Sequence, residues 1–183
     1  MKSNKYILIG IPNCGKTTLG QRAADILQIP FFDTDSLTVE KLNLEHPTEI
    51  FRTVFNQRFL TEQYKVMAEL AEQKGSAIVA TGAEVALRPE CAKLMQKIGT
   101  IIHIQRKPDI ALAEYKNNGK RVIVMRDVKN NIEIDMQAEA IKIYAQEYLE
   151  YETLADLTLE NNGSEDEGLE KLIALINKHS GES

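Results

Sequence analysis

The chain of 183 residues carries 43 % apolar and 27 % charged side chains, a balance typical of a soluble globular domain. Its formal net charge of −5 lacks the basic excess of most nucleic-acid-binding surfaces, and no run approaches the roughly 20 apolar residues of a membrane span. We therefore expect a single domain over residues 1–183, with neither a nucleic-acid nor a membrane partner. The start lacks a signal-peptide core and the two cysteines suit a reducing compartment, which predicts a cytoplasmic protein. We also expect a monomer or weak dimer.

Short apolar runs rich in β-branched residues alternate along the chain with longer stretches of helical periodicity. We expect strands at 5–10, 30–33, 76–81, 100–105 and 156–160, and helices at 15–28, 36–41, 49–74, 88–98, 108–117, 135–154 and 167–178. Runs such as Tyr-Ile-Leu-Ile at 6–9 are apolar at every position, which is typical of strands buried on both faces of a parallel sheet. The alternation predicts an α/β fold whose parallel sheet is covered on both sides.

One connection is longer and more polar than the others. Residues 117–134 contain Asn-Asn-Gly and then Lys120, Arg121, Arg126 and Lys129. Long polar connections of this kind often close over a ligand. We therefore expect a mobile lid at about 117–134.

The first predicted strand runs into a phosphate-binding motif. Residues 10–17 read Gly-Ile-Pro-Asn-Cys-Gly-Lys-Thr, which matches G-x-x-x-x-G-K-[ST] between a strand and an amphipathic helix. Glycines let the backbone curl around phosphates, while the inward amides and the helix N-terminus favour negative charge. The nucleotide-binding residues are then Asn13, Cys14, Gly15, Lys16, Thr17 and Thr18. Lys16 is expected to reach the β- and γ-phosphates and Thr17 to ligate Mg²⁺. The motif predicts ATP and Mg²⁺ as cofactors.

Cys14 contributes to this loop mainly through its backbone, and we expect its thiol to be incidental. If the thiol is exposed, MgATP should slow its alkylation.

Two aspartates follow the second predicted strand, in Pro-Phe-Phe-Asp-Thr-Asp at 30–35. Because side chains alternate along a strand, Asp33 and Asp35 are expected to face the same ligand crevice at the carboxyl ends of the strands. One carboxylate can support Mg²⁺ through water, and the other can accept a proton from an attacking hydroxyl. The alternative is that Asp35 only caps a helix that begins at Ser36.

These features together resemble the shikimate kinase family. The resemblance rests on Gly-x-x-x-x-Gly-Lys-Thr-Thr-Leu-Gly, Phe-Phe-Asp-Thr-Asp, Ile-Phe nine residues before Phe59, Ala-Thr-Gly at 80–82, Gly-Lys-Arg at 119–121 and Ala-Asp at 155–156. It covers the chain from Tyr6 to the last helix. It implies a five-stranded parallel sheet of the nucleoside-monophosphate-kinase type with a lid. It also implies phosphoryl transfer from ATP to a hydroxyl of a small carboxylated ring.

The resemblance also implies roles for individual residues. Thr17 corresponds to the Mg²⁺ ligand and Asp33 to the carboxylate that supports the metal. Asp35 corresponds to the contact with the substrate hydroxyl, and Arg121 to the lid arginine that meets the transferred phosphate. The catalytic set is then Lys16, Asp35 and Arg121, with Asp35, Gly82 and Ala83 at the substrate. The family's other lid arginine falls on Glu114, for which Lys116 or Lys120 is a candidate replacement.

The acceptor side departs from the family pattern. The family holds the acceptor carboxylate with two arginines and seats the ring on a triple-glycine turn, but these positions are Leu60, Glu147 and Gly82-Ala83-Glu84 here. Arg58 does not replace the first arginine, because two residues along a helix turn it about 200° away. Losing paired arginine contacts predicts poor shikimate binding. Glu84 and Glu147 would make the pocket better suited to an amine or a polyol than to an acid. The alternative is that Glu84 and Glu147 are solvated surface residues.

The sequence therefore predicts an ATP-dependent small-molecule kinase, with a hydroxylated small molecule as its partner. The alternative is a nucleotide-binding regulatory or interaction module that has lost acceptor phosphorylation, and a nucleoside-monophosphate kinase is a third, weaker interpretation. Tyr144, Tyr148 and Tyr151 follow helical spacing and are expected to pack in the core or at the base of the lid. His103 is expected to be a packed strand residue.

Overall fold

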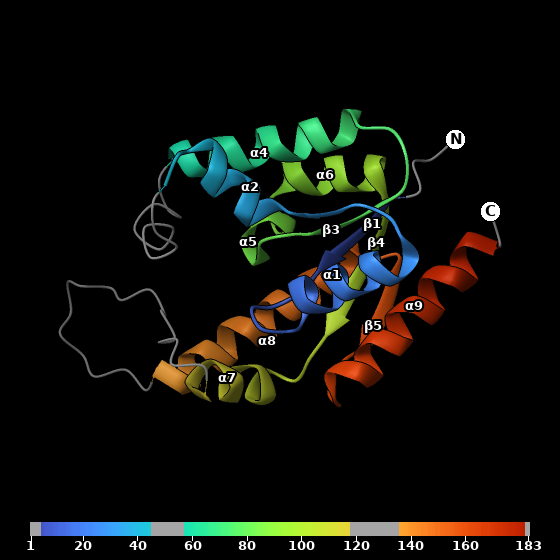
Figure 1. Cartoon of the computed structure of the whole chain (residues 1–183). Helices are drawn as coiled ribbons and strands as arrows, with labels where there is room; N and C mark the ends of the chain where they lie inside the picture. The colour runs from blue at the N-terminus through green and yellow to red at the C-terminus, as the bar shows by residue number, and fades with distance from the viewer. Residues whose placement is uncertain (1–4, 45–56, 118–135, 182–183) are drawn as a thin grey trace.

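The computed structural model describes residues 5–44, 57–117 and 136–181. Five parallel strands form one sheet in the order β2-β3-β1-β4-β5 (Figure 1). Their bounds are Lys5–Ile9 for β1, Phe31–Asp33 for β2, Ala77–Ala80 for β3, Gly99–Gln105 for β4 and Leu157–Glu160 for β5. The structure confirms all five predicted strands, with ends that differ by one residue.

Eight helices lie in the described part of the chain. They are α1 Lys16–Leu27, α2 Thr34–Lys41, α4 Gln57–Glu72, α5 Ala83–Ala86, α6 Pro89–Ile98, α7 Pro108–Asn117, α8 Met136–Leu154 and α9 Glu165–Gly181. The single turn α5 was not predicted, because four residues are too few to show a helical period. The start of the helix expected at 49–74 and the lid expected at 117–134 lie almost entirely outside the described residues.

The sheet is covered on both sides. Figure 1 shows α4 and α6 on one side of the strands and α1 and α9 on the other. The central residues Ile7, Leu8 and Ile9 of β1 are fully buried, as are Ile101 and Ile102 of the neighbouring β4. This explains why the sequence of these strands shows continuous apolar runs rather than alternation. None of the helices in the described ranges is long and apolar enough to cross a membrane.

The order of the strands determines where a ligand can bind. β1 lies between β3 and β4. After β1 the chain builds β2 and β3 on one side of it, and then crosses to the other side to build β4 and β5. In open parallel sheets, ligands bind beyond the carboxyl ends of the strands at such a switch point. The loop 10–15 follows β1 directly, and Asp33 ends β2 at the same edge of the sheet.

Candidate active site

The loop after β1 has the backbone shape that the phosphate-binding motif predicts. Gly10, Asn13 and Gly15 have φ values of 143°, 59° and 102°, in the left-handed region that favours glycine and tolerates asparagine. A methyl group on Gly10 would also lie 2.7 Å from the carbonyl oxygen of Ile104. Gly15 precedes α1 and provides no side-chain cap, so the first amides of this helix are left for an anion.

The ammonium group of Lys16 is held by the loop itself. Its Nζ donates to the carbonyl oxygens of Gly10 at 2.7 Å and Ile11 at 2.9 Å, and the Cys14 sulfur lies 3.6 Å away. Both Lys16 and Cys14 are buried. The lysine would exchange these carbonyl contacts for phosphate oxygens. The slower alkylation with MgATP was expected only for an exposed thiol. The Cys14 thiol is buried, so that condition is not met.

The side chains of Thr17 and Asp33 bring together hard oxygen atoms, the kind of ligand that Mg²⁺ prefers. The Thr17 hydroxyl donates to Oδ2 of Asp33 at 2.9 Å. The described residues contain no group of three or more histidine, cysteine, aspartate or glutamate side chains that could hold a metal ion. A metal at this point would therefore depend on phosphate and water for most of its ligands, as expected beside a phosphate loop.

The interpretation of Asp35 as the helix cap is wrong. Helix α2 begins at Thr34, and its cap is Asp33, whose Oδ1 accepts from the amides of Asp35 at 3.1 Å and Ser36 at 3.0 Å. The alternation argument fails for the same reason, because Asp35 lies in the first turn of a helix and not in a strand. The two carboxylates nevertheless lie close together, and the charge of Asp33 is one cause of the raised pKa of Asp35.

The Asp35 carboxylate is enclosed by groups from other elements. Nε2 of Gln63 in α4 donates to its Oδ1 at 3.1 Å. A methyl group on Gly82 would lie 2.3 Å from the same oxygen, so any side chain there would require the Asp35 carboxylate to shift. Desolvation is the main cause that raises the pKa of Asp35, followed by Asp33, while the Gln63 hydrogen bond and the charge of Lys16 oppose the rise.

The turn after β3 is tied to this site. The Gly82 amide donates to Oγ1 of Thr34 at 3.1 Å, which joins the turn to the start of α2. The carbonyl oxygen of Ala83 accepts from the hydroxyl of Tyr151 at 3.0 Å. Lys16, Asp33, Asp35 and the turn at 82–83 therefore gather at one end of the sheet, although their roles remain predictions.

The positions where the family's acceptor arginines were expected lie on helix faces that reach this site. Leu60 precedes Gln63 by three residues in α4, and Glu147 precedes Tyr151 by four residues in α8, so each pair shares a helix face. Gln63 contacts Asp35 and Tyr151 contacts Ala83. Leu60 and Glu147 therefore share helix faces with residues that contact Asp35 and Ala83, and neither is a cation.

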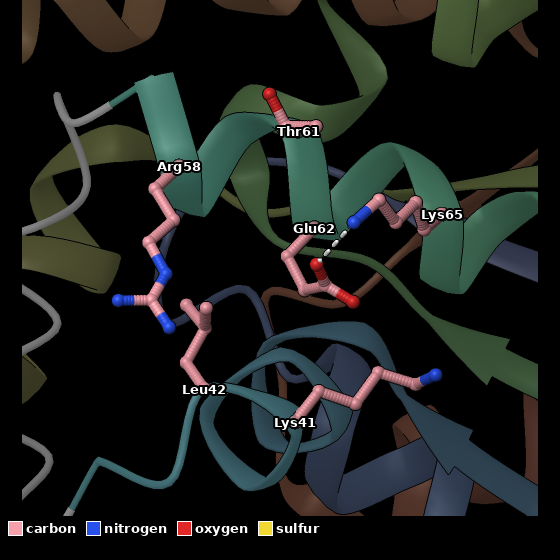
Figure 2. Close-up of a pocket in the computed structure, with 6 residues that line it drawn as sticks. All are labelled: Lys41, Leu42, Arg58, Thr61, Glu62 and Lys65. Carbon is pink, nitrogen blue, oxygen red and sulfur yellow. Dashed lines mark hydrogen bonds and ion pairs between the residues drawn. The ribbon is translucent and has the colours of Figure 1, made fainter.

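Arg58 lines a cleft between α2 and α4. The cleft has a volume of about 380 Å³ and is also lined by Lys41, Leu42, Thr61, Glu62 and Lys65 (Figure 2). Figure 2 shows its side chain extending toward Leu42. Lys41 is the last residue of α2, and the helical rise places it about 9 Å along the axis from Asp35 in the first turn. Arg58 therefore does not take the place of an arginine at position 60.

Three contacts of the site were not predicted. They involve Gln63, Tyr151 and Asn161, whose Nδ2 donates to the carbonyl oxygen of Cys14 at 2.8 Å. Asn161 directly follows β5, so the rule that ligand-site residues gather beyond the carboxyl ends of strands would have identified it. No local signal distinguishes Gln63 or Tyr151 from other helix residues, because their partners are distant in sequence.

Arg121 and Lys120 lie outside the described residues, as does nearly all of the predicted lid; Lys116 and Glu114 are in α7. Among the other predicted nucleotide-binding residues, Asn13 donates from Nδ2 to the carbonyl oxygen of Ala111 at 3.3 Å. Thr18 is exposed in the first turn of α1.

Comparison with known proteins identifies a family for this chain. Residues 12–177 match the model of the shikimate kinase family. A shikimate kinase from Pelotomaculum thermopropionicum is 32 % identical over 127 residues, which cover 69 % of this chain and 73 % of the relative. A shikimate kinase from Francisella tularensis subsp. novicida is 25 % identical over 164 residues, which cover 90 % of this chain and 89 % of the relative.

Solved structures share the fold. A shikimate kinase from Acinetobacter baumannii in complex with shikimate aligns with a TM-score of 0.77 at 20 % identity, covering 96 % of this chain and 94 % of that one. A gluconokinase from Sinorhizobium meliloti 1021 aligns with a TM-score of 0.60 at 12 % identity, covering 100 % of this chain and 97 % of that one. These alignments confirm the predicted five-stranded P-loop kinase fold. The chain belongs to the shikimate kinase family, and it is an ATP-dependent kinase that transfers a phosphoryl group to a hydroxyl of a small molecule.

Proposed function

We propose that this kinase uses MgATP to phosphorylate a neutral or cationic hydroxylated acceptor, such as a polyol or amino alcohol, in preference to shikimate. The observation that carries the proposal is the contrast between the two sides of the site. On the donor side, Lys16 lies in the phosphate loop and Thr17 is bonded to Asp33. On the acceptor side, Leu60 and Glu147 occupy the faces that reach Asp35 and Ala83.

The donor half holds the nucleotide and its metal. The amides of Asn13 to Thr18 and the Lys16 ammonium would bind the phosphates, and the left-handed turns of the loop support this role. The Thr17 hydroxyl would ligate Mg²⁺ with Asp33 in support. Bound Mg²⁺ neutralises the charge of the phosphates, and Arg121 from the predicted lid at 117–134 would add a second positive charge at the transferred phosphoryl group.

The acceptor half provides a general base and a surface that positions the acceptor. Asp35 would accept a hydrogen bond and then the proton from the attacking hydroxyl. The turn at Gly82 and Ala83 would set the position of the acceptor, since Gly82 packs directly against the carboxylate. A carboxylate on the acceptor would meet Glu147 in place of an arginine. Such a loss costs a few kcal/mol, and every ~1.4 kcal/mol is tenfold in affinity.

A coupled assay of ADP release tests the proposal with shikimate, gluconate, sorbitol and ethanolamine as acceptors. We expect turnover above acceptor-free ATP hydrolysis with sorbitol or ethanolamine, at a kcat/KM at least about tenfold above that for shikimate. Asp35→Asn is the control, and it should abolish acceptor-dependent turnover while MgATP still binds. A kcat/KM that is highest for shikimate would overturn the acceptor class. Tight MgATP binding without any acceptor turnover would favour the nucleotide-binding module.

A further inference from the structure

Tyr151 connects helix α8 to the turn that packs against Asp35. Its side chain is fully buried, and its hydroxyl donates to the carbonyl oxygen of Ala83 at 3.0 Å. The two residues are 68 positions apart in the sequence. The preceding residue of the turn, Gly82, lies so close to the Asp35 carboxylate that a methyl group there would be 2.3 Å from Oδ1. A movement of the turn would therefore change the space beside Asp35.

The ring of Tyr151 packs against His103, which lies beside the first residue of the phosphate loop. Its centroid lies 5.3 Å from that of His103, and the His103 ring also contacts Tyr148 edge-on at 4.9 Å. His103 pairs with Ile9 at the end of β1, and a methyl group on Gly10 would lie 3.4 Å from its Cδ2. The same aromatic cluster of His103, Tyr148 and Tyr151 thus packs below the phosphate loop and reaches the turn at 82–83.

We propose that Tyr151 is a positioning residue that holds the turn at 82–83 at the distance from the phosphate loop which phosphoryl transfer to the acceptor requires. The inference rests on the proposed function only in assigning the turn to the acceptor. Because its side chain is fully buried, Tyr151 would act on the substrates through Ala83 and not by direct contact. Because transfer depends on alignment, a displacement of about 1 Å can cost on the order of a hundredfold in rate. Hydrolysis of ATP uses a water molecule, which does not depend on the turn at 82–83 for its position. The rate of hydrolysis should therefore be much less sensitive to a displacement of this turn.

The test compares Tyr151→Phe with Tyr148→Phe. The first substitution deletes the hydroxyl that binds Ala83 and keeps the ring against His103. The second is the matched control, because Tyr148 contacts the same ring and no hydrogen bond of its hydroxyl is found in the described part of the chain. The first readout is the ratio of acceptor phosphorylation to ATP hydrolysis, measured with shikimate, gluconate, sorbitol and ethanolamine, together with the KM for ATP. The second is hydrogen exchange of peptides that cover residues 81–88, measured without acceptor.

In Tyr151→Phe we expect the coupling ratio to fall about 10- to 100-fold with the KM for ATP unchanged. We also expect exchange in residues 81–88 to become about fivefold faster. Tyr148→Phe should match the wild type in both readouts. Equal losses of acceptor phosphorylation and ATP hydrolysis, an unchanged coupling ratio, unchanged exchange, or the same effects in Tyr148→Phe would each overturn the proposal. If the wild type phosphorylates none of the four acceptors, the proposed function fails, and the exchange of residues 81–88 alone decides whether Tyr151 anchors the turn.

Discussion

At the scale of single residues, the site is determined by close contacts around Asp35. The Gln63 amide donates to one carboxylate oxygen, and Gly82 packs so closely that a side chain there would require the carboxylate to shift. Desolvation and, to a smaller extent, the charge of Asp33 raise the pKa of Asp35, while the Gln63 hydrogen bond and the charge of Lys16 lower it. If Asp35 acts as the base proposed above, the substrate hydroxyl must approach it from the side that Gln63 and Gly82 leave open.

At this scale we predict that two side chains, Leu60 and Glu147, determine which acceptor the enzyme prefers. Replacing Leu60 and Glu147 together by arginine should raise kcat/KM for shikimate by at least about a hundredfold, because two cations then face the acceptor carboxylate and one repulsive charge is gone. Steady-state kinetics with shikimate and sorbitol measure the change, and sorbitol should gain nothing. Arg58→Ala is the control, since Arg58 lines the separate cleft between α2 and α4. A double variant that remains as poor with shikimate as the wild type would show that these positions do not face the acceptor.

At the scale of elements, α2 begins where it does because of Asp33. Asp33 is the last residue of β2. Its Oδ1 caps α2 and its Oδ2 accepts a hydrogen bond from Thr17, so this one residue connects a strand, a helix and the phosphate-binding motif. Helix α2 in turn places Thr34 to bind the amide of Gly82. The start of α2 therefore couples the position predicted for the metal to the position predicted for the acceptor.

The two roles of Asp33 are separable by substitution. Asn is as good a helix cap as Asp, so Asp33→Asn should keep the free energy of unfolding within about 0.5 kcal/mol of the wild type, whereas Asp33→Ala should lose about 1 kcal/mol. Both variants lack the carboxylate beside Thr17 and should need about tenfold more Mg²⁺ for half-maximal ATP turnover. Urea denaturation and Mg²⁺ titration measure the two effects. If Asp33→Asn titrates with Mg²⁺ like the wild type, Asp33 serves only as a cap.

At the scale of the whole molecule, one buried imidazole makes stability depend on pH. His103 is fully buried in β4, and neither ring nitrogen has a hydrogen-bond partner in the described structure. Desolvation, with a smaller effect from the charge of Lys16, lowers the pKa of His103 from 6.5 to about 4. Between these values the unfolded chain binds a proton that the folded chain does not, so the folded state loses stability as the pH falls.

The expected size of this effect follows from the pH interval. Between pH 7 and pH 5 the wild type should lose about 2 kcal/mol more of its free energy of unfolding than His103→Phe, which has no group to protonate. The loss should level off below about pH 4, where both states of the wild type hold the proton. Urea denaturation at pH 7, 6 and 5 measures the difference, and the carboxylates shared by both proteins cancel from it. Parallel curves for the two proteins would mean that His103 is not protonated on unfolding.

Much of the fold could be predicted from local patterns. Apolar runs located β1, β3 and β4, because strands buried on both faces show little polar alternation. The shorter β2 and β5 are only partly buried, and they were located by short β-branched or aromatic runs between helical stretches. His103, Tyr144 and Tyr151 pack in the core as expected for an apolar strand and for one face of a helix. The beginning of α2 was placed two residues late, since two aspartates stood where either could cap, and the sequence does not say which carboxylate turns back to the amides.

The sequence by itself determined the class of reaction. The phosphate loop and the two aspartates after the second strand are local features, in which neighbours along the chain remain neighbours in space. The family resemblance rests on short motifs of the same kind. Only the tertiary structure decided how Asp35 is enclosed, that Arg58 lines the cleft between α2 and α4, and that Tyr151 reaches Ala83. The contact of Gln63 with Asp35 joins residues 28 positions apart, and that of Tyr151 with Ala83 joins residues 68 positions apart. Their geometry depends on how helices pack on the sheet, for which the chain carries no short-range signal.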